Sequence, residues 1–399
     1  MKKFNKFLSV AVASAMVMSM AGCGNTDNGS AATGTNAATE SAASGSVFKI
    51  GGIGPTTGGA AVYGLAVQHG AEIAVEEINA AGGINGYQIE FKFQDDEADA
   101  EKSVNAYNAL KDWGAQIIDG STTSGACIAV TDKTKEDNMF QITPSGSAVE
   151  CVQYDNNFRV CFSNPNQGLA SAQYIGENGL AEKIAVIYDS SDVYSSGIYE
   201  KFVKEAENQP FEVVAAEAFT ADNKTDFSVQ LQKAKDAGAD MVFLPIYYQE
   251  SALILTQAAA MGYAPKWFSC DGMDGILGGE DNFDVSLTEG VMLLTPFSAD
   301  VSDDLTQSFV TKYKEKYGET PNQFAADSYD AIYVIKAAIE KSGVTPDMSV
   351  SDICDGMKAA MTEITVDGLT GNGMTWTADG EANKAPKAVV IENGAYKAM

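Results

Sequence analysis

The sequence is poor in histidine, with only His69 among its 399 residues. Ser-His-Asp and Cys-His catalysis need an imidazole base, so only this residue could serve, and a His-rich zinc site is excluded. The stretch around His69 has the apolar spacing of an amphipathic helix, and His69 lies off its buried stripe. We therefore expect an exposed histidine without a chemical role and a protein that is not an enzyme. The stripe is formed by Val67, Gly70, Ala71, Ala74, Val75 and Ile78.

The six cysteines include no CxxC pair, which excludes zinc-ribbon and thioredoxin-like sites. We expect neither a metal nor a cofactor. Cys151 and Cys161 bracket the segment CVQYDNNFRVC. They are compatible with a disulfide, which persists outside the cytoplasm, and equally with two buried free thiols.

Basic residues are scarce: 26 Lys and Arg stand against 54 Asp and Glu, a formal net charge of −28. Such a surface repels nucleic acid and anionic membranes, so nucleic acid is excluded as a partner. Long apolar runs are also missing, because no segment after the N-terminal region approaches the length of a membrane-spanning helix.

The N-terminal segment MKKFNKFLSVAVASAMVMSMAGC is typical of an export signal. Three lysines precede a short apolar run, which ends in small residues before Cys23. This end resembles a lipobox, so we expect a signal peptide over 1–22 and lipidation of Cys23. Residues 23–46 are rich in Gly, Ala, Ser, Thr and Asn and cannot bury enough apolar surface to fold. They predict a flexible tether whose reach is on the order of 25 Å.

From Val47 onward, short apolar runs alternate with amphipathic stretches, which predicts an α/β fold with parallel sheets covered on both faces. The alternation occurs in two blocks, 47–163 and 166–295, and therefore predicts two doubly wound lobes. The C-terminal end reads as extended chain with turns at Asp379-Gly380 and Asn393-Gly394. The expected helices are 64–80, 99–112, 125–137, 166–178, 195–207, 226–237, 250–261, 302–317 and 324–341.

The loop GGIGPTTGG after the first predicted strand is not a nucleotide site. A phosphate loop needs Gly-Lys-Ser/Thr at the start of its helix, and the dinucleotide fingerprint needs GxGxxG. Gly52, Gly54 and Gly58 are instead spaced GxGxxxG with Pro55 inside.

Other strand ends suit a small zwitterion. The segment GSTTSGAC (120–127) ends a strand and opens a helix, with Ser124 as the expected N-cap, and TPSGS (143–147) repeats the pattern. Such a helix start binds a carboxylate through N–H groups and hydroxyls. Asp271 in SCDGMDG follows another strand, and Gly272 beside it gives close access. A carboxylate here suits an ammonium group, although each of these loops is also explained by turn chemistry alone.

These motifs together resemble the type I periplasmic solute-binding proteins of the leucine/isoleucine/valine-binding branch, in a lipoprotein form. The resemblance runs from Val47 to the C-terminus, in IGGIGPTTGGAAVYG, EEINAAGGINGYQIEF, DDEADAEKSVNAYNAL, STTSGA, ITPSGS, the DxxxVYSSG stretch and DGMDG. It implies two lobes joined by a three-segment hinge and closing on an amino acid. We expect 47–164 with 298–372 as the first lobe and 165–297 with 373–399 as the second.

The resemblance also assigns roles to nine residues. It implies a carboxylate clamp of hydroxyls, with Thr123 and Ser124 as alternatives in the alignment and Ser145 and Ser147 at the neighbouring strand end. Asp271 stands where branched-chain members often carry Glu and faces the ammonium group. The implied aromatic and apolar wall consists of Tyr63, Tyr194, Tyr247 and Phe324.

The function implied is that of a monomeric substrate-binding component of an ABC importer. Anchored by Cys23 on the extracytoplasmic face of the membrane, it presents its amino acid to a permease. A sensor or adaptor that presents the solute to a receptor is the alternative, since the same fold serves it. An extracellular enzyme would need an unaided carboxylate pair, for which Asp271 and Asp274 are the candidates.

Overall fold

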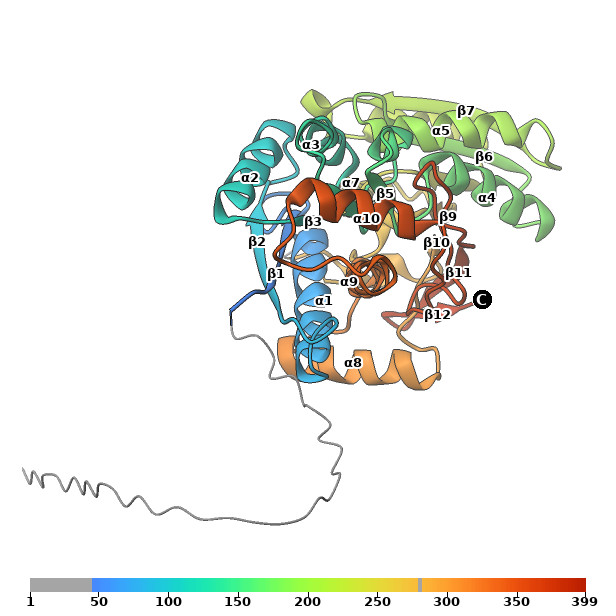
Figure 1. Ribbon diagram of the computed structural model, residues 1–399. Coiled ribbons are helices and arrows are strands. Elements are labelled where there is room, and N and C mark those ends of the chain that lie inside the picture. Colours follow the sequence, from blue (N-terminus) through green and yellow to red (C-terminus); the bar gives the residue numbers. More distant parts are fainter. Residues whose placement is uncertain (1–44, 279–281) are drawn as a thin grey trace, which may run out of the picture. The chain divides into compact units, whose positions relative to one another are not determined.

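The computed structural model describes residues 45–278 and 282–399, which form two sheets with their covering helices (Figure 1). The first sheet has five parallel strands in the order β2-β1-β3-β4-β5. Because the order reverses beside β1, the loops after β1 and β3 open a crevice at the carboxyl edge of this sheet. The strands are β1 (Phe48–Gly54), β2 (Ile89–Asp95), β3 (Ile117–Asp119), β4 (Phe140–Thr143) and β5 (Asn157–Arg159).

The second sheet has seven strands in the order β12-β11-β10-β9-β8-β6-β7. The parallel part repeats the order of the first sheet, so its crevice opens after β6 and β8. The C-terminal hairpin β11–β12 adds two antiparallel strands, as the Asn393-Gly394 turn predicts. The strands are β6 (Lys183–Asp189), β7 (Glu212–Phe219), β8 (Met241–Leu244), β9 (Lys266–Ser269), β10 (Met292–Thr295), β11 (Lys387–Glu392) and β12 (Ala395–Ala398).

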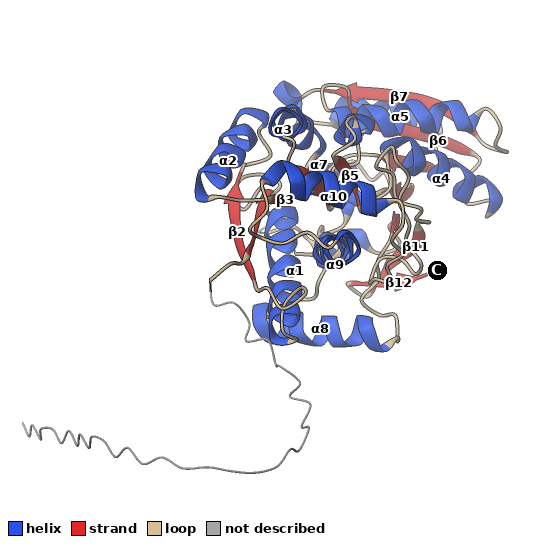
Figure 2. Ribbon diagram, viewed as in Figure 1, coloured by secondary structure: helices blue, strands red, loops and turns tan. Residues whose placement is uncertain are grey.

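Helices cover both sheets (Figure 2). The first sheet carries α1 (Ala61–Ala80), α2 (Ala100–Trp113) and α3 (Ser124–Asp137), and the second carries α4 (Asn164–Glu177), α5 (Val193–Ala206), α6 (Ser228–Asp236) and α7 (Tyr248–Ala260). Short 3-10 turns occupy Val149–Val152, Ala221–Asn223, Asp271–Met273 and Val285–Thr288. Each predicted helix is present with its bounds shifted by at most three residues, which confirms the α/β fold.

Three late helices, α8 (Asp304–Tyr317), α9 (Gln323–Ser342) and α10 (Val350–Met361), pack with the first sheet and its helices although they follow β6–β10 in the chain. The helix α9 is mostly buried and packs against α1, α10 packs against α9 and β4, and α8 contacts α1 (Figure 1). We call the first sheet with α1–α3 and α8–α10 the first lobe, and the second sheet with α4–α7 the second lobe. The exact lobe boundaries stay a prediction.

The structure corrects the expectation for His69. Its ring stacks on Tyr317 of α8 with the centroids 3.6 Å apart, and Nδ1 lies 3.3 Å from the hydroxyl of Tyr313. The side chain is 20% exposed, because α8 covers the face of α1 that the local pattern leaves to solvent. His69 is therefore a packing residue between two helices.

The structure contains three elements that the sequence pattern does not predict: β5, β10 and α10. Both strands are short, with three and four residues. A signal for α10 exists, because Ser349 Oγ accepts a hydrogen bond from the backbone N–H of Asp352 and caps the helix.

Among the described residues, no helix is long and apolar enough to cross a membrane.

Candidate functional site

A small cavity of about 10 Å³ lies where the strand ends of the two lobes meet. It has room for about one water molecule, so the side chains of the two lobes nearly fill the space between them. Eight of the nine residues named from the sequence line it, and Ser147 does not. The lining consists of Tyr63, Thr122, Thr123, Ser124, Ser145, Tyr194, Tyr247, Asp271, Gly272 and Phe324.

The first lobe supplies hydroxyl groups from the start of α3. Thr123 is the N-cap residue, so the expected cap at Ser124 is one residue off. Ser124 Oγ instead accepts hydrogen bonds from the backbone N–H groups of Ser147 and Ala148, at 3.2 and 3.1 Å. Thr123 Oγ1 is buried and has no hydrogen-bond partner. Of the two alternatives, Ser124 joins two loops of the protein while Thr123 keeps its hydroxyl available.

The neighbouring strand end is held by the buried guanidinium of Arg159. Its nitrogens donate to the carbonyl oxygens of Gly146 and Ala148, at 3.2 and 2.8 Å. Within this loop Ser145 lines the cavity and its Oγ donates to Thr122 O at 2.7 Å. Ser147 lies outside the lining because its backbone N–H is turned to Ser124 Oγ.

The second lobe supplies the one carboxylate of the cavity lining, Asp271, which is 3% exposed. Its Oδ1 accepts from the hydroxyl of Tyr194 at 2.6 Å, and its Oδ2 accepts from Nε2 of Gln167 at 2.9 Å. Burial raises the pKa of Asp271 to about 7, although both of these hydrogen bonds favour the charged form. A carboxylate has room for about four hydrogen bonds, so an incoming cation finds acceptor positions still open.

Glycine is required at position 272 because the hydroxyl of Tyr194 lies against it. A Cβ atom there would come within 2.6 Å of that oxygen and 2.9 Å of Ile246 O. The same hydroxyl accepts from the N–H of Gly272 at 2.9 Å. Tyr194 therefore binds both Asp271 and the following residue, and its hydroxyl lies in the space beside this glycine; that Gly272 gives a ligand close access stays a prediction.

Tyr63 reaches from α1 of the first lobe into the second. Its hydroxyl donates to Gly272 O and accepts from the backbone N–H of Tyr248 at 3.1 Å. The ring lies 4.3 Å from that of Phe324 and meets Tyr247 edge-on at 5.5 Å, between ring centroids. Burial raises the pKa of Tyr63 well above its usual value, so the hydroxyl stays neutral. One side chain thus builds the apolar wall and links the lobes.

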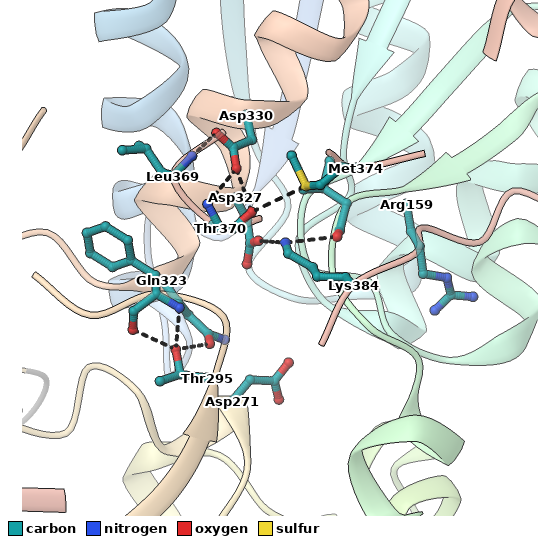
Figure 3. A network of polar contacts seen from close by, with 12 residues as sticks. Arg159, Asp271, Thr295, Gln323, Asp327, Asp330, Leu369, Thr370, Met374 and Lys384 are labelled. Atoms are coloured by element: carbon teal, nitrogen blue, oxygen red, sulfur yellow. Dashed lines mark hydrogen bonds and ion pairs between the residues drawn. The ribbon is translucent and has the colours of Figure 1, made fainter. Parts of the chain in front are cut away.

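Figure 3 shows a buried polar network beside Asp271. Asp327 of α9 accepts from Nζ of Lys384 at 2.7 Å, and the same amine donates to Val160 O at 3.0 Å. Because Lys384 precedes β11 and Val160 follows β5, this amine joins two segments that connect the sheets. Burial raises the pKa of Asp327 to about 6, and Lys384 opposes that rise.

A larger cavity of about 330 Å³ adjoins the first, since Thr123 and Tyr247 line both. Four carboxylates, from Glu97, Asp189, Asp192 and Glu250, and the single amine of Lys224 line it. Burial raises the pKa of Asp192 to about 6. The approach to the inner cavity is therefore acidic.

The five described cysteines, at 127, 151, 161, 270 and 354, are buried free thiols. Of the two interpretations of Cys151 and Cys161, the structure has the free thiols. Cys23 lies outside the described residues. Within 45–278 and 282–399 no group of three His, Cys, Asp or Glu residues could hold a metal ion. The carboxylate of Asp274 accepts from the N–H of Gln323 at 2.9 Å and belongs to the protein's own framework.

Sequence reasoning missed Gln167, Arg159 and Lys384, which hold the site in place. Each side chain is buried. Gln167 lies 104 positions from Asp271 and Lys384 lies 57 positions from Asp327, so no local pattern connects them. Arg159 contacts a loop 11 to 13 positions before it. A weak signal exists for Gln167, because it follows Pro165 in the first turn of a helix that opens the second block.

The chain belongs to the periplasmic binding protein family, whose pattern matches residues 47–395. It is 30% identical over 298 residues to the leucine-, isoleucine-, valine-, threonine- and alanine-binding protein of Pseudomonas aeruginosa, covering 74% of this chain and 79% of that one. It is also 30% identical over 304 residues to the Leu/Ile/Val-binding protein homolog 3 of Brucella melitensis, covering 75% and 80%.

Solved structures give the same result. The branched-chain amino acid transporter substrate-binding protein LivJ from Streptococcus pneumoniae, in complex with isoleucine, matches with a TM-score of 0.79 and 29% identity, over 88% of this chain and 99% of that one. The leucine-binding protein LivK from Thermotoga maritima matches with a TM-score of 0.78 and 27% identity, over 88% and 98%.

This protein is therefore a substrate-binding protein of the extracytoplasmic type, and its relatives are named for binding and not for catalysis.

Proposed function

We propose that this protein captures a branched-chain amino acid or a close analogue between its two lobes and presents it to the permease of an ABC importer. One observation carries the proposal. The two lobes line the same small cavity with complementary groups: the first lobe supplies the available hydroxyl of Thr123, and the second supplies the buried carboxylate of Asp271. The relatives named for leucine, isoleucine and valine support this class of ligand.

The first lobe binds the ligand carboxylate. Thr123 Oγ1 and the first N–H groups of α3, which have no partner within the helix, face the negative charge. Ser145 lies beside them in the cavity, with its own O–H donated to Thr122 O. Asp271 of the second lobe binds the ammonium group. The side chain of the ligand lies against the rings of Tyr63, Tyr194, Tyr247 and Phe324. Ser124 and Ser147 support the clamp by joining its two loops.

Closure of the two lobes follows because each lobe binds a different end of the ligand. A zwitterion that touches Thr123 and Asp271 together stabilises the arrangement in which the lobes meet, and the difference in its affinity for the closed and open arrangements is what drives closure. A permease that recognises the closed arrangement thereby senses the bound solute.

The N-terminal part completes the proposal. Residues 1–22 direct export, Cys23 carries the lipid, and residues 23–46 tether a monomeric binding body to the extracytoplasmic face of the membrane. Replacing Cys23 with Ala in the full-length protein should release it into the medium while ligand affinity is unchanged. Retention of that variant in the membrane fraction would contradict the anchor.

The test of the ligand is titration calorimetry of the body from residue 45 onward with Leu, Ile, Val, Thr, Ala, Lys and Glu. We expect the first three to bind most tightly and the charged ones to fail. A protein that binds none of them would contradict the proposal. Growth on the bound amino acid as sole nitrogen source, with and without the gene, separates import from sensing.

A further inference from the structure

We propose that Gln167 is a positioning residue for the ligand's ammonium group, because its side-chain amide fixes the carboxylate of Asp271 in the cavity. This inference rests on the proposed function and deepens it. Gln167 is fully buried in the first turn of α4, directly after the chain enters the second lobe. It lies outside the cavity lining, so it acts through Asp271 and has no role as a ligand-binding residue of its own.

The amide of Gln167 holds Asp271 at two points. Its Nε2 donates to Asp271 Oδ2 at 2.9 Å, and its Oε1 accepts from the backbone N–H of Asp271 at 3.4 Å. One turn along α4, the hydroxyl of Ser171 lies 3.5 Å from the thiol of Cys270. One face of α4 thus contacts two consecutive residues after β9, Cys270 and Asp271, and not Asp271 alone.

Tyr194 completes the arrangement from a second helix. Its hydroxyl donates to Asp271 Oδ1 at 2.6 Å, so each carboxylate oxygen has its own donor. Two donors on two oxygens fix the rotation of the carboxyl plane and leave about two acceptor positions for a ligand. Neither donor carries a charge, so the ionised form of Asp271 keeps its full negative charge for the ammonium group.

The pKa of Asp271 shows why hydrogen bonds to its carboxylate are needed. Burial, with a smaller contribution from the nearby Asp327, raises the pKa of Asp271 to about 7, against the hydrogen bonds from Tyr194 and Gln167 that lower it. Asp327 is itself paired with Lys384 (Figure 3). Without Gln167 the pKa of Asp271 rises, and less of it is ionised at neutral pH. The other titratable groups that interact with Asp271 are the neutral side chains of Tyr63, Tyr247, Cys161 and Cys270.

The test is the pH dependence of leucine affinity in Gln167→Met, which keeps the length of the side chain and removes both polar contacts. Gln173→Met is the matched control: it is the same change on the same helix, at a glutamine whose Nε2 donates to Glu205 at 3.4 Å. Calorimetry from pH 6 to 9 gives the acid limb of binding for each protein, and thermal melts report folding.

We expect the wild type and Gln173→Met to lose affinity below about pH 7, where Asp271 takes up a proton. In Gln167→Met the limb should move up by about one pH unit, with affinity roughly fivefold weaker at pH 7 and largely restored at pH 8.5. Gln167→Glu, which keeps the shape but sets a second acid against Asp271, should move the limb further and serves if the Met variant does not fold.

An unmoved acid limb in a folded variant at position 167 overturns the inference, whether affinity is unchanged or is reduced equally at every pH. Wild-type protein that binds no amino acid at any pH contradicts the proposed function instead, so the two failures are distinguishable.

Discussion

The two sides of the cavity treat opposite charges in different ways. The first lobe offers hydroxyls and a helix N-terminus, with no charged side chain among its residues in the lining. The second lobe offers an ionisable carboxyl group, and burial alone would favour its neutral, protonated form. Backbone N–H groups and hydroxyls can bind an anion without a charged side chain in the lining. On the anionic side Gln167 and Tyr194 donate to the carboxylate itself, whereas on the neutral side Arg159 donates to the backbone of a loop.

The largest effect should come from Asp271→Asn, which removes the charge and keeps the shape. Loss of a charge-assisted hydrogen bond in a buried site costs about 3 kcal/mol, so leucine affinity should fall on the order of 100-fold in calorimetry. Asp274→Asn, three residues later and equally buried, is the control and should retain affinity within about threefold. Equal losses in both variants would remove the distinction between the two carboxylates.

The Asp271→Asn variant also tests how Asp271 affects the stability of the protein. Because the pKa of Asp271 is raised in the folded state, the native protein holds a proton that the unfolded chain releases between about pH 4 and 7. The stabilisation is complete below pH 4 and is lost as the pH rises through 7. Asp271→Asn should therefore melt above the wild type at pH 8 and show no such gain at pH 4, by circular dichroism.

A second pair of variants tests the neutral side. Thr123→Val removes an unpartnered buried hydroxyl, so affinity should fall about tenfold while stability stays the same or rises. Ser124→Ala removes the acceptor of two backbone N–H groups, so unfolding free energy should drop by about 1–2 kcal/mol. The reverse pattern, with Ser124 controlling affinity and Thr123 stability, would show that the clamp is assigned to the wrong residue.

The smallest effect should come from Tyr63→Phe, which removes the hydroxyl that joins the lobes. Affinity should fall two- to fivefold, about 0.5–1 kcal/mol, and the ligand-free protein should have a larger radius of gyration by X-ray scattering. Tyr107→Phe serves as the control, because its hydroxyl donates to Asp137 within the first lobe. A radius unchanged in Tyr63→Phe would mean that the hydroxyl does not hold the lobes together.

Much of the fold follows from local pattern. Strand and helix periods predict the paired lobes, and polar loops after the strands predict where the site lies, since β1, β3, β4, β8 and β9 all end near it. What local pattern cannot supply is the partner of a side chain. The helical period places His69 on an open face, yet α8 covers that face from more than 200 residues away.

The same limit applies within the site. Thr123 and Ser124 are adjacent hydroxyl residues, and the sequence does not say which one turns toward the loop of Ser147. Nor does it bring Gln167 to Asp271, because that pairing depends on how α4 packs beside β9. Residues that touch the cavity come from motifs at strand ends, while residues that hold them come from tertiary packing.

The placement of α9 has a consequence for how the protein is made. The helix α1 is among the first elements to be synthesised, and its long partner α9 comes only after all of β6 to β10. A chain emerging from the ribosome, or passing through a secretion channel, cannot bury that face of α1 until nearly the whole sequence has appeared. The first lobe therefore cannot be completed before residue 342, the last of α9, has been synthesised.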